Sequence, residues 1–102
     1  MEINISTQGA ETVAALIGRL DTPASIEAAP ILDSLNDKAS GTIVLDCHQL
    51  TYISSSGLRI FLTLRKAASE KGGKVIVRGL CPDVRSVFMM TGFLSLFVIE
   101  DD

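Results

Sequence analysis

Residues 42–58 read TIVLDCHQLTYISSSGL, and they join a short buried strand to the start of a helix. Residues 42–45 are continuously apolar and rich in β-branched side chains, which is typical of a strand buried on both faces of a parallel sheet. A polar loop is expected to follow, up to Ile53. Three serines, 54–56, then lead into an amphipathic helix over residues 58–71.

The rest of the chain repeats this alternation of strand and helix patterns. Further strands are expected at residues 3–5, 13–17, 75–77 and 96–99, and further helices within residues 22–38 and 82–92. The order is therefore β-β-α-β-α-β-α-β. It predicts one α/β domain over residues 1–102, with a mostly parallel sheet after an opening β-hairpin.

Three local features refine this outline. Thr22 is expected to be the N-cap of the first helix, with Pro23 in its first turn. Pro30 either kinks that helix or separates a short turn from a helix over residues 30–38. Residues 9–11 are expected to form a hairpin turn longer than two residues.

Size and charge exclude several classes of protein. The chain has 102 residues and a net charge of -3, so it carries no basic stripe for nucleic acid and no polybasic membrane anchor. Its most apolar stretch, residues 87–99, is shorter than the roughly 20 residues that span a bilayer. Residues 1–5 lack the pattern of a secretory signal. We therefore expect a cytoplasmic protein without direct membrane insertion, whose Cys47 and Cys81 are reduced thiols.

The three serines lie where an α/β fold places functional sites. A helix start presents unpaired N–H groups and a partial positive charge, and functional crevices lie at the carboxyl ends of strands. This turn is therefore suited to a phosphate group. The structural alternative is that the serines only cap the helix, but one serine is enough for capping, so at least one hydroxyl has no structural task.

The segment resembles the signature of the STAS domain family, in which a strand and an aspartate precede a D-S-S-G-L type sequence that opens a helix. The matching residues are V-L-D at 44–46 and I-S-S-S-G-L at 53–58. G-R-L-D at 18–21 is similar to the turn before the first helix of the family. P-D-V-R at 82–85 and T-G-F at 91–93 are similar to its last helix and the following turn.

The resemblance implies a non-enzymatic bacterial regulator of transcription, an anti-sigma factor antagonist. The phosphorylated serine of the family aligns with Ser55, and Ser54 stands where the family has its aspartate, so Ser54 and Ser56 are the alternative acceptors. The implied partner is an anti-sigma factor with a histidine-kinase-like ATP-binding fold, which is also the kinase in a partner-switching cycle. The residues expected to contact it are Asp21, Thr22, Ser54, Ser55, Ser56, Gly57 and Arg59.

A second function within the same family is also consistent with the sequence. The chain could be a STAS scaffold without phosphorylation, for example an accessory subunit of a lipid or anion transport complex. The missing aspartate favours this alternative, whereas the serine cluster favours the antagonist.

Other chemistry finds little support in the sequence, and we expect no catalytic residue, metal or cofactor. His48 is the only histidine and has no pattern of metal ligands around it. A hydrolase built from Ser55, His48 and Asp46 is rejected, because the G-x-S-x-G elbow is missing. Cys47 is expected to be a small buried residue. The apolar residues Phe93, Leu94, Leu96 and Phe97 are expected in the core rather than in a docking patch.

Overall fold

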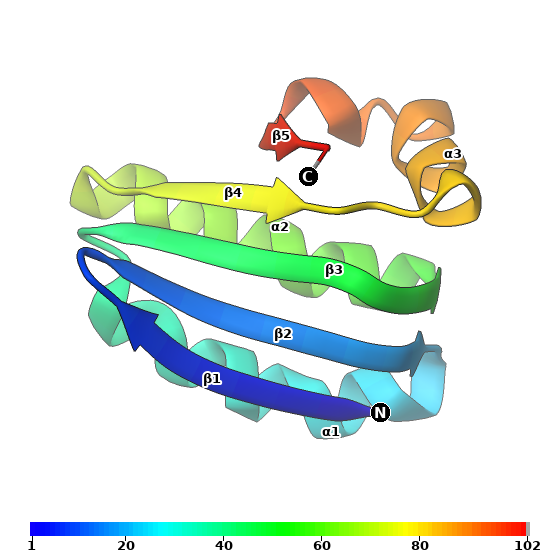
Figure 1. The fold of residues 1–102 in the computed structure, drawn as a ribbon, viewed down its shortest axis with the longest axis horizontal. Helices are drawn as coiled ribbons and strands as arrows, with labels where there is room; N and C mark the ends of the chain where they lie inside the picture. The colour runs from blue at the N-terminus through cyan, green and yellow to red at the C-terminus, as the bar shows by residue number, and fades with distance from the viewer. Residues whose placement is uncertain (102) are drawn as a thin grey trace.

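The computed structural model describes residues 1–101, which form a five-stranded sheet with helices packed against it (Figure 1). The strands are β1 (Glu2–Gln8), β2 (Glu11–Leu20), β3 (Thr42–Ile53), β4 (Lys74–Arg78) and β5 (Val98–Glu100). The helices are α1 (Thr22–Asp33), α2 (Ser55–Lys71) and α3 (Pro82–Met90), with short 3₁₀ helices η1 (Ser34–Lys38) and η2 (Phe93–Ser95). The strand order is β1-β2-β3-β4-β5, with β1 antiparallel and the others parallel, so the expected α/β fold is confirmed.

The opening hairpin has a tighter turn than the sequence predicted. Gln8 pairs with Glu11, so only Gly9 and Ala10 form the turn. Gly9 has a φ of 64°, which is accessible to glycine at the first central position of a two-residue hairpin turn. The expectation of a longer turn was therefore wrong.

The polar stretch after residue 45 is not a loop, because β3 continues to Ile53 beside β2. Two irregularities in the pairing explain why the sequence conceals this. Ala15 pairs with Asp46 but Ile17 pairs with Gln49, so β3 carries one extra residue there. A second extra residue lies at Thr51, between the next two pairs along the strand. Such β-bulges break the two-residue alternation that identifies a half-buried strand.

The bulges also set which side chains of β3 face the core. Cys47, Leu50 and Ile53 are buried at intervals of three residues, whereas His48 and Tyr52 are exposed. Ile53 thereby anchors the end of the strand immediately before the three serines.

The first helix begins one residue earlier than expected. Asp21, not Thr22, is its N-cap, and the Asp21 carboxylate accepts a hydrogen bond from the backbone N–H of Ala24. Pro30 does not divide the helix, which runs through it to Asp33. Proline removes one backbone hydrogen bond, but buried apolar residues on both sides of it hold this part of the helix against the sheet.

The last segment is also organised differently from the prediction. The last strand was expected over residues 96–99, but β5 covers Val98–Glu100, so it begins two residues later, and the 3₁₀ helix η2 precedes it. The third helix agrees with the sequence, since it begins at Pro82 and Gly92 follows it in a left-handed conformation. Phe97 is buried, and the other three residues of the apolar segment pack against the core, so the prediction of core rather than docking patch is confirmed.

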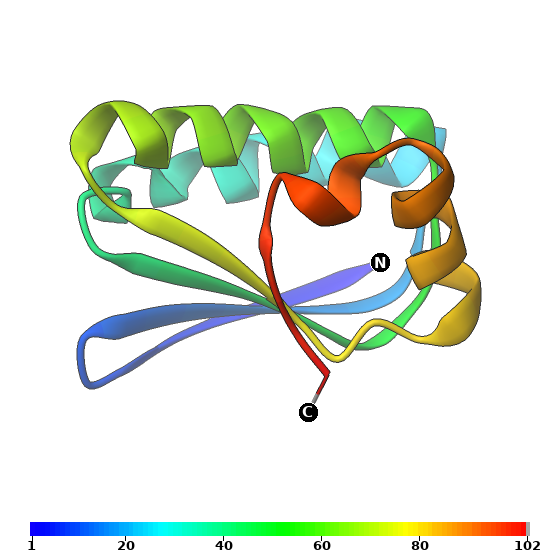
Figure 2. The same cartoon turned by 90° about the horizontal axis from the view of Figure 1, so that it is seen from above.

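Helices α1 and α2 lie side by side on one face of the sheet, as Figure 2 shows. The main core lies beneath them and includes Phe61 and Phe88, both fully buried. A small second cluster of Val13, Val44 and Ile76 lies on the opposite face, one residue from each central strand. Within residues 1–101, no helix is long and apolar enough to cross a membrane.

Candidate functional site

The site lies where β3 ends and α2 begins, and Ser54 forms the junction. Its backbone is extended, and its N–H donates to the carbonyl of Leu20 at 2.9 Å. Its hydroxyl oxygen accepts a hydrogen bond from the N–H of Gly57 at 3.1 Å. Ser54 is only 8% exposed, so it is the buried N-cap of α2. One of the three serines therefore has the structural task that the capping interpretation assigned to it.

Ser55 is the first residue of α2 and is exposed. Among residues 1–101, no hydrogen bond involves its hydroxyl, whereas that of Ser54 is engaged. Ser56 is half-buried. The geometry thus separates the three serines: Ser54 holds the helix start, and Ser55 presents its hydroxyl to solvent.

Gly57 is required by close packing between α2 and β2. A Cβ atom at this position would lie 2.8 Å from two side-chain atoms of Leu20 and 2.9 Å from the side chain of Ile53. Both neighbours are buried, so they have little room to move. The absence of a side chain at Gly57 therefore allows the first turn of α2 to lie directly on the ends of β2 and β3.

The first turn of α1 is tied to this junction through Ser25, which the sequence analysis did not single out. Ser25 is 4% exposed, and its hydroxyl donates to the carbonyl of Asp21 at 2.8 Å. The hydroxyl oxygens of Ser25 and Ser54 are 3.5 Å apart. A serine inside an amphipathic segment gives no signal of such a contact, because its partner is 29 residues away.

The residues predicted to contact a partner form one neighbourhood, but they differ in accessibility. Thr22, Ser55 and Arg59 are exposed, and Asp21 and Ser56 are half-buried. Ser54 and Gly57 are buried, so they can support the surface but offer little area to a partner. The starts of α1 and α2 lie at the same end of the sheet (Figure 1).

A second feature at this end of the sheet was also missed. Arg19 and Tyr52 are paired across β2 and β3, and the Arg19 guanidinium lies 4.4 Å from the centre of the Tyr52 ring. Both residues are exposed. Stacking of this kind holds an arginine in a defined position near the serines. Pairing of two polar residues on adjacent strands could not be foreseen while residues 46–53 were expected to form a loop.

The side chains of Asp46 and His48 are in hydrogen-bond contact on β3. The Nδ1 atom of His48 lies 2.5 Å from Oδ1 of Asp46, which also accepts from the His48 N–H at 3.1 Å. Burial raises the pKa of Asp46, but the hydrogen bonds from His48, together with electrostatic interactions with His48 and Arg78, outweigh this effect, so the pKa lies below its ordinary value. In the described part of the chain, no group of three or more potential metal ligands occurs.

The two cysteines are free thiols that differ in exposure. Cys47 is fully buried, as expected, and burial raises the pKa of its thiol well above the ordinary value. Its thiol is therefore protonated and unreactive at neutral pH. Cys81 is half-buried and donates to the carbonyl of Leu50.

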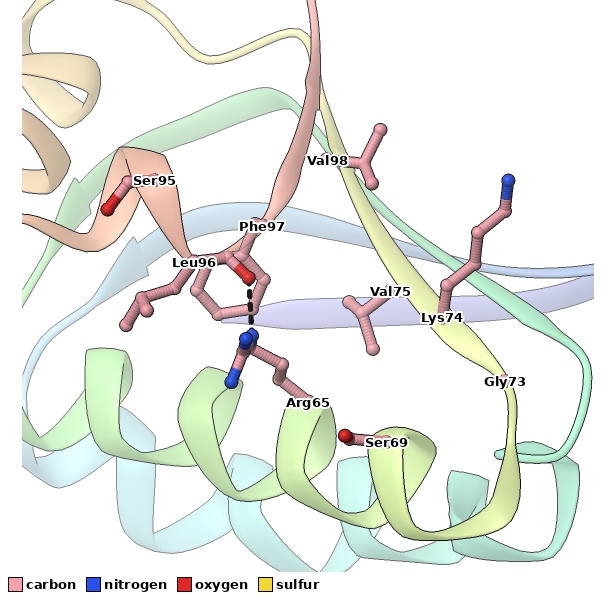
Figure 3. Close-up of a pocket in the computed structure, with 9 residues that line it drawn as sticks. All are labelled: Arg65, Ser69, Gly73, Lys74, Val75, Ser95, Leu96, Phe97 and Val98. Carbon is pink, nitrogen blue, oxygen red and sulfur yellow. Dashed lines mark hydrogen bonds between the residues drawn. The ribbon is translucent and has the colours of Figure 1, made fainter.

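A hollow of about 300 Å³ lies at the other end of α2 (Figure 3). It is lined on one side by Arg65 and Ser69 of α2, and on the other by the start of β4 and the segment before β5. Arg65 donates a hydrogen bond to the carbonyl of Leu96 across it. Ser69 is fourteen residues after Ser55, which is roughly 20 Å along the helix axis, so this hollow is separate from the serine site.

Comparison with known proteins shows which family the chain belongs to. The model of the STAS domain matches residues 2–102. The chain belongs to the STAS domain family. A curated relative of this STAS domain is BtrV of Bordetella bronchiseptica, named as a candidate anti-sigma factor antagonist. It is 42% identical over 65 residues, which make up 64% of this chain and 56% of the relative. The matched region thus spans little more than half of that protein.

Solved structures show the same fold at low sequence identity. A candidate anti-sigma factor antagonist from Thermotoga maritima superposes with a TM-score of 0.89 at 17% identity, over 98% of this STAS domain and 86% of that chain. The Bacillus cell fate determinant SpoIIAA in its phosphorylated form has a TM-score of 0.73 at 20% identity, over 96% and 90% of the two chains. These likenesses establish the architecture of the domain.

Proposed function

We propose that this STAS domain is an anti-sigma factor antagonist, a binding module without catalytic activity that is switched off by phosphorylation of Ser55. The observation that supports this most directly is the exposed Ser55 hydroxyl at the first position of α2, beside a buried serine that already caps the helix. The relative BtrV and the fold shared with SpoIIAA, known in a phosphorylated form, support the same function.

The partner in this proposal is an anti-sigma factor with a histidine-kinase-like ATP-binding fold that is also the kinase. It docks on the surface around Ser55, which includes Thr22 and Arg59. The γ-phosphoryl group of ATP moves to the Ser55 oxygen: the new O–P bond forms, the bond to ADP breaks, and the hydroxyl proton passes to a base of the kinase. The sigma factor is free while the antagonist occupies the anti-sigma factor.

The physical basis of switching is local. A phosphoserine carries about -1.5 to -2 charges, and at a helix N-terminus such a charge is tolerated or favourable. The fold therefore survives modification. Burying that phosphate in an interface removes it from water, and this desolvation costs several kcal/mol, which is about a hundredfold or more in affinity.

The test is incubation of the purified protein with its kinase and ATP, followed by mass spectrometry of the resulting peptides. We expect a single phosphate on Ser55 and none after Ser55→Ala. Labelling of Ser54 or Ser56 instead would contradict the assignment of the site. Absence of any label, together with nucleotide-independent binding, would favour the unphosphorylated scaffold.

A further inference from the structure

Ser55 and Arg59 lie four residues apart on α2, and both are exposed. The helix is continuous from Ser55 to Lys71. Residues at this spacing are neighbours on a helix surface, with their Cβ atoms about 5–6 Å apart. The two side chains therefore emerge one above the other on the same face of the helix.

The Arg59 guanidinium is not committed elsewhere in the described structure. Apart from the backbone hydrogen bonds of the helix, the hydrogen bond found at Arg59 runs from the Thr63 hydroxyl to the Arg59 backbone carbonyl and does not involve the guanidinium. The ion pairs found among residues 1–101 involve Arg78 and Arg85, not Arg59. The sole acidic residue of α2 is Glu70, eleven residues further along, which is three turns away.

We propose that Arg59 is the intramolecular counter-ion of phosphorylated Ser55, an inference that rests on the proposed function. Four residues along the helix, a guanidinium can donate two parallel hydrogen bonds to a phosphate, which a lysine ammonium does less well. The order is also the favourable one, with the anion N-terminal to the cation. The geometry gives the phosphate a partner within the same helix.

This pairing changes what phosphorylation does to the docking surface. Modification adds a negative group and also withdraws Arg59, one of the exposed cations of that surface, into an ion pair. The surface of the phosphorylated form therefore differs from that of the free form in two charged groups, the added phosphate and the withdrawn guanidinium. It also gains order in the first turn of α2, because the pair bridges that turn.

The inference can be tested without the kinase. The full chain is made with phosphoserine incorporated at position 55 during synthesis, and the phosphate is titrated by ³¹P NMR. A nearby cation favours the dianion, so we expect Arg59→Gln to raise the second pKa of the phosphate by about 0.2–0.4 pH units. Arg59→Lys should restore part of the difference, and Lys66→Gln, which removes an exposed cation further along α2, should leave the titration unchanged.

Two outcomes would overturn the inference. One is an identical phosphate titration in the parent and Arg59→Gln proteins, and the other is an equal effect of Lys66→Gln. Because phosphoserine is incorporated directly, this result does not depend on whether a kinase selects Ser55. A failure of kinase labelling would count against the proposed function alone, and an unchanged titration against the role of Arg59 alone.

Discussion

The hydroxyl oxygens of Ser25 and Ser54 lie 3.5 Å apart and connect the first turns of α1 and α2. The direction of this hydrogen bond follows from the proton count. The single hydroxyl proton of Ser25 goes to the carbonyl of Asp21, so Ser54 must donate to Ser25. The Ser54 oxygen in turn accepts from the Gly57 N–H. A directed chain of hydrogen bonds therefore runs from the start of one helix to the start of the other.

These connected hydrogen bonds predict that Ser25 and Ser54 are energetically coupled. Ser54→Ala removes the cap of α2 and should lower the free energy of unfolding by about 1 kcal/mol. Ser25→Ala leaves the buried Ser54 hydroxyl without its acceptor and should cost about 1–2 kcal/mol. The double variant should lose at least about 0.5 kcal/mol less than the sum, measured by urea denaturation. Additive losses would show that the 3.5 Å contact carries no energy.

Gly57 should tolerate no side chain. Alanine is normally a better helix residue than glycine by about 1 kcal/mol, but here its Cβ would overlap the buried Leu20 side chain. We expect Gly57→Ala to lower the free energy of unfolding by about 1–3 kcal/mol. Ser69→Ala, at an exposed position of the same helix, is the matched control and should be neutral or slightly stabilising. Stabilisation by Gly57→Ala would mean that α2 can move away from β2.

The Asp46–His48 pair should make stability depend on pH in the acid range. The pKa of Asp46 is lowered in the folded protein, so below about pH 4 the unfolded state binds more protons than the native state. The stabilisation is thus present above that range and is lost as the pH falls through the folded pKa. Asp46→Asn should be less stable than the parent at pH 7, and the gap should narrow toward pH 3 in urea unfolding. A gap that stays constant would argue against a charged carboxylate as its source.

The order of the elements followed from the sequence because most of them carry strong local signals. The continuous apolar runs of β3 and β4 mark buried strands, and the stripe of α2 ending at Gly72 marks an amphipathic helix. The second half of β3 was lost because its bulges give Cys47, Leu50 and Ile53 a spacing of three, which matches no regular strand. The local pattern of apolar and polar residues does not reveal such irregularities in the pairing of two strands.

The location of the candidate site could be predicted from the sequence, but the hydrogen bonds within it could not. The serine run and the glycine after it identified the start of α2, where Ser55 is exposed. Which serine caps the helix depends on the backbone at Ser54 and on the position of Gly57. The contribution of Ser25 depends on how α1 lies against α2, which is a tertiary property without a local signal.

The most direct test of the central claim is the affinity of the anti-sigma factor for this protein with and without a phosphate on Ser55. Isothermal titration calorimetry on the parent, Ser55→Ala, Ser55→Asp and phosphoserine-55 forms gives the comparison, with thermal unfolding recorded for each. We predict tight binding by the parent and Ser55→Ala, and at least about a hundredfold weaker binding by the phosphorylated form, with weakening also for Ser55→Asp and all forms folded. Equally tight binding by the phosphorylated and unphosphorylated proteins would contradict the account.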